Sequence, residues 1–177
     1  PLPAENVRAD LNTASAKSLK RQLIKEALTL VRNENGLIPF GELDTIRLAS
    51  LSIGASKKTP FQNRLDSYAR FLHLQSGKSL SASQQKRVVD RLAEYDAVLV
   101  SLHDMSSYAS REFGITESTR DLIYELSLRT KVVLTVFGSP YALRYFDDVD
   151  WVLEAYDDDP MTQDLAAQSL FGAFPLR

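Results

Sequence analysis

The segment AVLVSL, residues 97–102, is an almost unbroken run of apolar side chains. Such a run is typical of a parallel strand that is buried on both faces, because crossover connections place helices on both sides of a parallel sheet. A helical pattern follows at 116–130, and a second apolar run, KVVLTVFG, follows at 131–138. This alternation around residues 97–102 predicts an α/β fold.

The same alternation extends over most of the chain. Strands are expected at 45–53, 68–75, 97–102, 131–138 and 150–156. Helices are expected from Pro60 and at 81–95, 116–130, 140–146 and 160–172. Right-handed crossovers between such units favour the flavodoxin-like strand order 2-1-3-4-5. We therefore predict a three-layer α/β/α sandwich around a mainly parallel, five-stranded sheet.

The start of the chain is expected to add a linker and one more helix. Residues 1–13 are polar with two prolines and suit an interdomain linker, while residues 14–177 form the folded domain. In SAKSLKRQLIKEALTLVRNENG, residues 15–36, a helix is predicted because apolar residues recur at helical spacing. These residues are Leu19, Leu23, Ala27, Leu30 and Val31. Because the chain starts at Pro1 rather than at methionine, we expect it to be a piece of a longer protein.

Composition limits the classes of function. A chain of 177 residues with 44% hydrophobic content can bury the core of one globular domain. The 21 basic and 23 acidic residues are scattered without a basic stripe, which argues against a nucleic-acid partner. No apolar run approaches the roughly 18 to 20 residues of a membrane span. Cysteine is absent and His73 has no second histidine at ligand spacing, so neither a disulfide nor a metal site is expected.

Any functional site is expected in the loops that follow the carboxyl ends of the strands. These loops are 54–59, 76–80, 103–115, 138–139 and 157–159. Asp159 precedes Pro160 and can cap the last helix, while Asp157 and Asp158 lie near its positive end. Gln163, in the first turn of that helix, can offer an amide to a site or to a neighbouring domain.

Two chemistries common in this fold class find little support. GASKKT, residues 54–59, lacks the spacing of a P-loop, and no G-x-G-x-x-G follows the first strand, so a nucleotide site is not indicated. Asp104 could imitate the phosphorylated aspartate of a receiver domain. However, Ser52 and Ile53 stand where such a domain needs further acidic residues.

Three stretches carry a resemblance to a known family. VVLTVFGSPYAL (132–143) and VLEAYDDDPMTQDLAAQSLFGAF (152–174) resemble the end of the C-terminal α/β sandwich domain of family 3 glycoside hydrolases, and LIKEALTLVRNENGLIPF (23–40) is similar to its opening. The resemblance implies a preceding (β/α)8 barrel in the same polypeptide, with the aspartate nucleophile and most of the sugar pocket. It also implies a retaining mechanism without a cofactor, and it makes a periplasmic or extracellular bacterial setting plausible.

The loop after the third strand decides which branch of the family is closer. In the family's β-glucosidases this domain supplies a glutamate as acid/base at that point. Here Leu102, His103 and Asp104 stand where a glycine-glutamate pair would follow the strand, and Glu112 is the only glutamate of the loop. Glu112 is therefore one candidate acid/base. A dyad of His103 with Asp104 is the other, since a carboxylate can orient an imidazole for proton transfer.

The lack of a glycine-glutamate pair after the third strand fits the family's β-N-acetylglucosaminidases better, because their acid/base is a histidine on a barrel loop. The resemblance thus favours an accessory domain, without catalytic residues of its own, of an exo-glycosidase that releases terminal β-linked sugars, above all N-acetylhexosamines. Contacts with the carbohydrate rim or the barrel are expected from Ser106, Ser107, Arg111, Glu112, Asp158 and Gln163. A domain that supplies its own acid/base and a free-standing flavodoxin-like binding module remain the alternatives.

Overall fold

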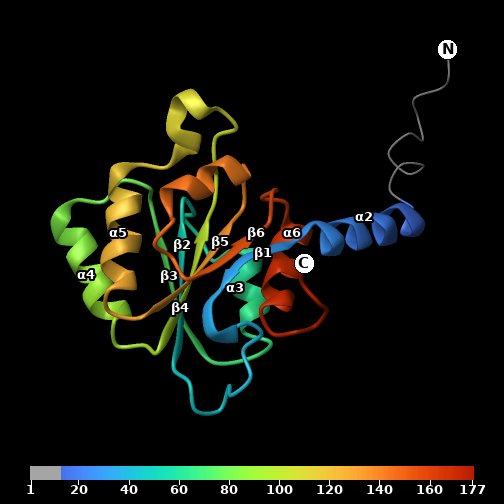
Figure 1. The fold of residues 1–177 in the computed structure, drawn as a ribbon, viewed down its shortest axis with the longest axis horizontal. Helices are drawn as coiled ribbons and strands as arrows, with labels where there is room; N and C mark the ends of the chain where they lie inside the picture. The colour runs from blue at the N-terminus through green and yellow to red at the C-terminus, as the bar shows by residue number, and fades with distance from the viewer. Residues whose placement is uncertain (1–12) are drawn as a thin grey trace.

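The computed structural model describes residues 13–177 (Figure 1), so the predicted linker lies outside the described residues except for Thr13. Within this part of the chain, six strands form one sheet in the order β1-β6-β5-β4-β2-β3. The parallel strands are β2 (Leu48–Ile53), β3 (Phe71–Ser76), β4 (Ala97–Leu102), β5 (Lys131–Val136) and β6 (Trp151–Glu154). These five follow the predicted order 2-1-3-4-5, but the predicted strand number is wrong, because a sixth strand, β1 (Thr29–Asn33), is added beside β6.

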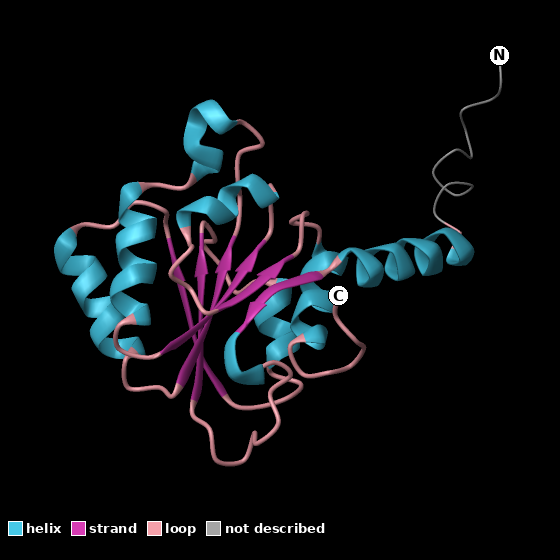
Figure 2. Ribbon diagram, viewed as in Figure 1, coloured by secondary structure: helices cyan, strands magenta, loops and turns pink. Residues whose placement is uncertain are grey.

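Helices cover both faces of the sheet and complete the predicted α/β sandwich (Figure 2). One face carries α3 (Pro60–Leu65) and α6 (Pro160–Ser169), and the other carries α4 (Ala82–Leu92) and α5 (Glu117–Ser127). Short 3₁₀ helices occupy Glu34–Gly36 (η2), Ala109–Gly114 (η3) and Pro140–Tyr145 (η4). Each face buries its own hydrophobic core, and every residue of β4 is buried, as its apolar run predicted.

The segment predicted as one helix over 15–36 divides into a helix and a strand. Helix α2 spans Ala14–Ala27, and β1 spans Thr29–Asn33 and pairs antiparallel with β6. The prediction is wrong beyond Ala27 because β6 would otherwise leave a row of unpaired backbone groups at the sheet edge. Leu30 and Val31 therefore belong to the strand β1, although their spacing continues that of the helix.

Helix α2 does not turn its leucines to the core. Leu19 is 58% exposed and Leu23 is 61% exposed, and α2 extends away from the body of the domain (Figure 1). No helix within residues 13–177 combines the length and the apolar character needed to cross a bilayer.

The five parallel strands end in one row. Ile53 is paired with Ser76 and Leu102, and Leu102 is followed across the sheet by Val136 and Glu154. The loops that the sequence predicted for a functional site therefore lie along one edge, the carboxyl edge of the sheet. This edge is where α/β proteins of this type hold their ligands.

Candidate functional site at the carboxyl edge

His103, the first residue after β4, is held inside the domain rather than facing solvent. It is 4% exposed, and its ring stacks on Phe137 with 5.0 Å between centroids. Its Nδ1 lies 2.7 Å from Asp158 Oδ1, and its Nε2 lies 2.9 Å from Ser101 Oγ. The imidazole therefore has a partner at each nitrogen.

The predicted pairing of His103 with Asp104 is not formed. The carboxylate of Asp104 instead lies 3.2 Å from Nζ of Lys78, on the loop after β3. Asp104 has a left-handed backbone (φ 51°), which turns its side chain away from the histidine. Adjacent residues at a strand end point in different directions, and the acidic partner comes from the end of another strand.

Asp158 is the point where this edge converges. Its Oδ1 also accepts from Nε2 of Gln163 (2.8 Å), and its Oδ2 accepts from the backbone N–H of Asp104 (2.9 Å). Oε1 of Gln163 accepts in turn from the N–H of Phe61, on α3 (3.3 Å). Gln163 is only 6% exposed and uses both amide atoms within the chain. We refer to Asp158, His103, Ser101 and Gln163 as the Asp158 cluster.

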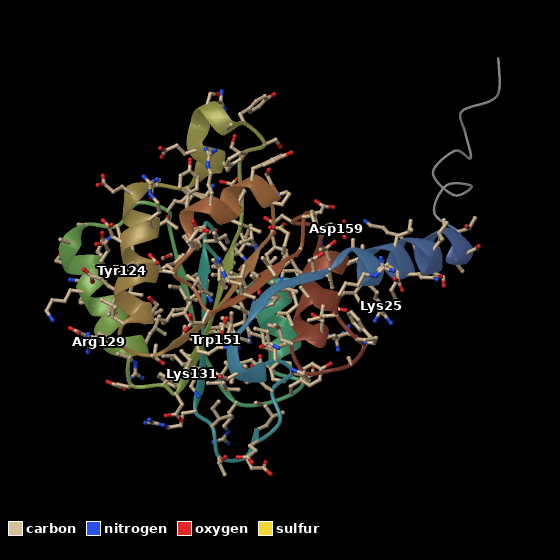
Figure 3. The ribbon with its side chains drawn as sticks, viewed as in Figure 1. Lys25, Tyr124, Arg129, Lys131, Trp151 and Asp159 are labelled. Carbon is tan, nitrogen blue, oxygen red and sulfur yellow. The ribbon has the colours of Figure 1, made fainter. Side chains whose placement is uncertain are left out.

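The neighbouring aspartate has the structural role that the sequence predicted. Asp159 caps α6 by accepting from the N–H of Met161 (2.9 Å), and it also binds Nζ of Lys20 on α2 (2.9 Å). Figure 3 shows Asp159 at the start of α6, on the side from which α2 extends. Of the three consecutive aspartates, Asp159 thus fixes a helix end, and Asp158 binds side chains of the interior.

Asp158, His103 and Ser101 repeat the acid–imidazole–hydroxyl order of a hydrolase triad. Ser101, however, is fully buried, and its hydroxyl lies 2.9 Å from that of Ser52, which is also fully buried. No substrate can reach a nucleophile in that position, so this triad cannot perform acyl transfer. Sequence reasoning missed Ser52 and Ser101. The signal available was a serine within an otherwise apolar, buried strand, since a buried hydroxyl needs a partner.

The second histidine repeats the arrangement at the β3 edge. His73 Nδ1 lies 2.7 Å from Ser50 Oγ, and His73 Nε2 lies 2.8 Å from Asp66 Oδ1. Gln62 of α3 donates to the same serine (2.9 Å). Both histidines of the chain therefore join a buried serine to a carboxylate, and neither is presented to a ligand.

Loop 103–115 is built on consecutive left-handed residues. Glu112 (φ 48°), Phe113 (φ 56°) and Gly114 (φ 75°) all have positive φ. Such a conformation costs about 1–3 kcal/mol at each non-glycine residue and persists only where other contacts hold it. Phe113 is 3% exposed, its carbonyl accepts from the N–H of Ser106 (2.9 Å), and the guanidinium of Arg144 lies 5.5 Å from its ring. Phe113 therefore anchors the loop.

The other predicted contact residues lie at the exposed part of this loop. Ser107 and Arg111 are exposed, and Ser106 is half-buried with its hydroxyl accepting from the N–H of Tyr108 (3.2 Å). The side chain of Glu112 is 52% exposed and lies 3.5 Å from a guanidinium nitrogen of Arg120. The structure thus joins His103, Asp158 and Gln163 by hydrogen bonds, whereas Glu112 belongs to η3. The segment that contains η3 projects from the body of the domain (Figure 1).

Glu154, at the end of β6, is a buried acid that sequence reasoning did not single out. It is 1% exposed, and burial raises the pKa of its carboxyl to about 7. Oε1 accepts from the N–H of Tyr156 (2.7 Å), whereas Oε2 has no hydrogen-bond partner within residues 13–177. Because the carboxyl is enclosed, it cannot protonate a substrate in solution.

An open groove of about 520 Å³ lies on the same edge, over the ends of β2, β3 and β4. Its polar lining comes from Ser56, Gln75, Ser76, Lys78, Ser79 and Asp104. Gly54 forms one wall with φ 88°, and a Cβ there would lie 2.5 Å from the carbonyl oxygen of His103. This close approach requires glycine at 54, and the lysine of the groove is paired with its aspartate. No cluster of three potential metal ligands occurs in the part of the chain that the structure describes.

No protein-family model matches the sequence, and no curated protein matches it. Solved structures do match. A glycoside hydrolase family 3 β-N-acetylglucosaminidase from Paenibacillus sp. has a TM-score of 0.71 at 15% identity, over 94% of this chain and 32% of that chain. A fungal multi-domain GH3 β-N-acetylglucosaminidase has a TM-score of 0.70 at 20% identity, over 99% of this chain and 20% of that chain. A β-glucosidase from Listeria innocua, in complex with laminaribiose, has a TM-score of 0.74 at 17% identity, over 97% of this chain and 27% of that chain.

The chain therefore spans a third or less of the length of these structures, although each of them covers nearly all of it. At these identities the likeness is one of fold. The resemblance carried by residues 23–40, 132–143 and 152–174 is thus confirmed at the level of the fold, which this chain shares with one part of family 3 glycoside hydrolases.

Proposed function

We propose that this chain is the accessory C-terminal domain of a longer, retaining family 3 glycosidase that releases terminal β-linked sugars, with N-acetylhexosaminides as the preferred class. The fold likeness and the sequence motifs at both ends of the domain support a parent hydrolase. The parent's barrel would carry the aspartate nucleophile and bind most of the sugar. This domain would pack against the barrel and border the carbohydrate site.

The observation that carries the proposal is the state of the two candidate proton donors. His103 is enclosed, with Ser101 and Asp158 at its two nitrogens. Glu112 lies close to Arg120, and it is the first of three consecutive residues with a left-handed backbone. A retaining glycosidase of the carboxylate type needs its two groups about 5 to 5.5 Å apart across the scissile bond. An accessory domain needs no such pair, because both catalytic groups belong to the barrel.

The exposed residues of loop 103–115 are the proposed contacts with the barrel or the pocket rim. Ser107 and Arg111 are free to reach a neighbour, and Arg111 lies 5.6 Å from the ring of Tyr108, which is 65% exposed. Arginine and tyrosine are enriched at the centres of protein interfaces. Asp158 and Gln163 support this edge from within.

The purified 177-residue chain should not hydrolyse a chromogenic N-acetyl-β-hexosaminide, whereas a polypeptide that also contains the preceding coding sequence should. In that longer protein, Glu112→Gln should leave kcat within about twofold of the parent value, because the residue does not touch the reacting atoms. Turnover by the isolated chain, or a preceding sequence without a (β/α)8 pattern, would contradict the proposal. The second result would favour a free-standing binding module.

A second candidate function has one observation in its favour. Glu112 is a half-exposed carboxylate on the loop that follows β4, where the resemblance places the acid/base of β-glucosidases. If it fills that role, Glu112→Ala in the longer protein should slow hydrolysis by about 10²-fold or more, in keeping with loss of a general acid. Added azide should then restore turnover through a glycosyl azide product. Loss of activity without azide rescue would indicate a structural role instead.

A further inference from the structure

We propose that Asp158 is a positioning residue which, acting with His103, fixes where loop 103–115 leaves the sheet. Its carboxylate accepts three hydrogen bonds of 2.7 to 2.9 Å, from the His103 ring, the Asp104 backbone and the Gln163 side chain. The first two donors stand at the start of the loop, directly after β4, and the third belongs to α6. A single side chain from the loop after β6 therefore joins the start of loop 103–115 to α6.

The entry of the loop is held from two sides. Asp104 has φ 51°, and its N–H points at Asp158, while its carbonyl and carboxylate both bind Nζ of Lys78. A charged acceptor on one side and a charged donor on the other are the stronger class of hydrogen bond. The left-handed turn at Asp104 is thus fixed by groups outside the loop, as a strained residue requires.

The exit of the loop is tied to the same lysine. The hydroxyl of Thr119, at the start of α5, donates to the Lys78 carbonyl (3.0 Å), and Thr116 donates to it as well. The Ser106 N–H to Phe113 carbonyl bond closes the loop between these two ends. Both ends of loop 103–115 are therefore fixed, and a change at Asp158 reaches the loop through Asp104.

The orientation of the imidazole depends on the buried hydroxyls behind it. The hydroxyl of Ser101 is hydrogen-bonded to Nε2 of His103 and to the hydroxyl of Ser52. The Ser52 hydroxyl in turn lies 3.4 Å from that of Thr59, which caps α3. Since Nε2 is taken and one ring face is stacked on Phe137, Nδ1 can only face Asp158. His103 thus presents one fixed donor to the carboxylate.

Hydrogen–deuterium exchange of the 177-residue chain tests this role. Asp158→Asn removes the charge and turns an amide nitrogen toward a donor, at almost unchanged volume. Amides of residues 104–114 should exchange about 10- to 100-fold faster, the range expected when a charge-assisted hydrogen bond is lost. Amides of α5 should keep their rates. Asp66→Asn is the matched control, because Asp66 pairs with the other histidine at 2.8 Å and should leave loop 103–115 unchanged.

Comparing the exchange rates of residues 104–114 with those of α5 keeps the test decisive even if Asp158→Asn lowers the stability of the whole domain. Exchange that rises by the same factor in the loop and in α5 would show a merely structural residue, and no rise in the loop would also overturn the proposal. His103→Gln provides the second variant and should loosen the same residues 104–114. Catalysis by the isolated chain, which would contradict the proposed function, leaves these exchange rates and their interpretation unaffected.

Discussion

Nδ1 of His103 lies 2.7 Å from Oδ1 of Asp158, although the two residues are 55 positions apart in the chain. The pair joins the ends of β4 and β6, which are separated in the sheet by β5. The interaction directs one oxygen of Asp158, in the 157–159 cluster, toward the buried His103 ring, while the Asp158 side chain stays 33% exposed. An acidic cluster that could be read as a reaction centre thus stabilises the edge of the sheet instead.

His103→Ala should lower the free energy of unfolding by about 2–4 kcal/mol. The substitution removes one hydrogen bond from Ser101 and one from Asp158, and it replaces the buried ring that stacks on Phe137 with a cavity. Ser101 keeps its contact with Ser52, and Asp158 keeps the donors of Asp104 and Gln163. Urea denaturation measures the change. Tyr124→Ala is the control, because Tyr124 is 53% exposed on α5 (Figure 3) and should change stability by no more than about 0.5 kcal/mol. Equal effects of both substitutions would show that the Asp158 cluster contributes nothing.

Gly54→Ala should destabilise the domain by about 2 kcal/mol or more, whereas Gly77→Ala should be nearly neutral. Gly54 has φ 88°, and an added Cβ would lie 2.5 Å from the His103 carbonyl oxygen, so both backbone strain and a clash oppose the change. Gly77 lines the same groove, has an ordinary φ and has no atom within 4 Å of an added Cβ. Thermal unfolding of both variants shows whether the loss of stability is specific to position 54 or follows from any glycine-to-alanine change in the groove. A stable Gly54→Ala protein would contradict the geometry of the groove.

The layers of the fold could be predicted because each parallel strand carries its own signal. Residues 97–102 are apolar except for Ser101, and all six are buried. The strand at Thr29–Asn33 could not be predicted in this way, because its partner is the free edge of β6 and only tertiary structure creates that edge. Leu30 continues the spacing of the preceding helix, so local pattern and tertiary pairing disagree there. The pairing decides the outcome.

The candidate site was predictable as an edge but not as a set of contacts. The loops were identified because parallel strands end together. The partner of His103 was not, because the distance of 55 residues to Asp158 is bridged only after the sheet forms. Ser52 and Ser101 carried a weak signal, as polar residues in buried strands, whereas Lys78 and Arg120 carried none, since charged residues in loops and on helix surfaces are ordinary.

Two neighbouring residues test the orientation of α2. Leu23 is 61% exposed, so Leu23→Ala should change the free energy of unfolding by no more than about 0.5 kcal/mol. Ile24 packs against the core under α3 and α6, so Ile24→Ala should cost about 1–2 kcal/mol, in line with its partial burial. Chemical denaturation of both variants provides the comparison. A larger cost at Leu23 than at Ile24 would mean that the helix presents the opposite face to the domain.

Glu154 should make stability fall as pH rises from about 4.5 to 7. The carboxyl has a pKa of about 7 in the folded domain because burial disfavours its charge, against an ordinary value of 4.5. Below pH 4.5 both states hold the proton, so the group imposes no cost. Between the two values the unfolded state releases its proton and the folded state does not, which favours unfolding. The full cost, on the order of 3 kcal/mol, is reached above pH 7.

Glu154→Gln removes this ionisation while its side-chain oxygen can still accept from the N–H of Tyr156. The variant should therefore be more stable than the parent at pH 8, by up to about 3 kcal/mol, and should differ little from it at pH 4. Urea denaturation at pH 4, 6 and 8 gives the three points. Glu125→Gln, on the exposed face of α5, is the matched control and should retain the parent's dependence on pH. If the difference between Glu154→Gln and the parent does not grow between pH 4 and pH 8, the carboxyl is already ionised in the folded domain, and its unpartnered Oε2 must then be reached by water.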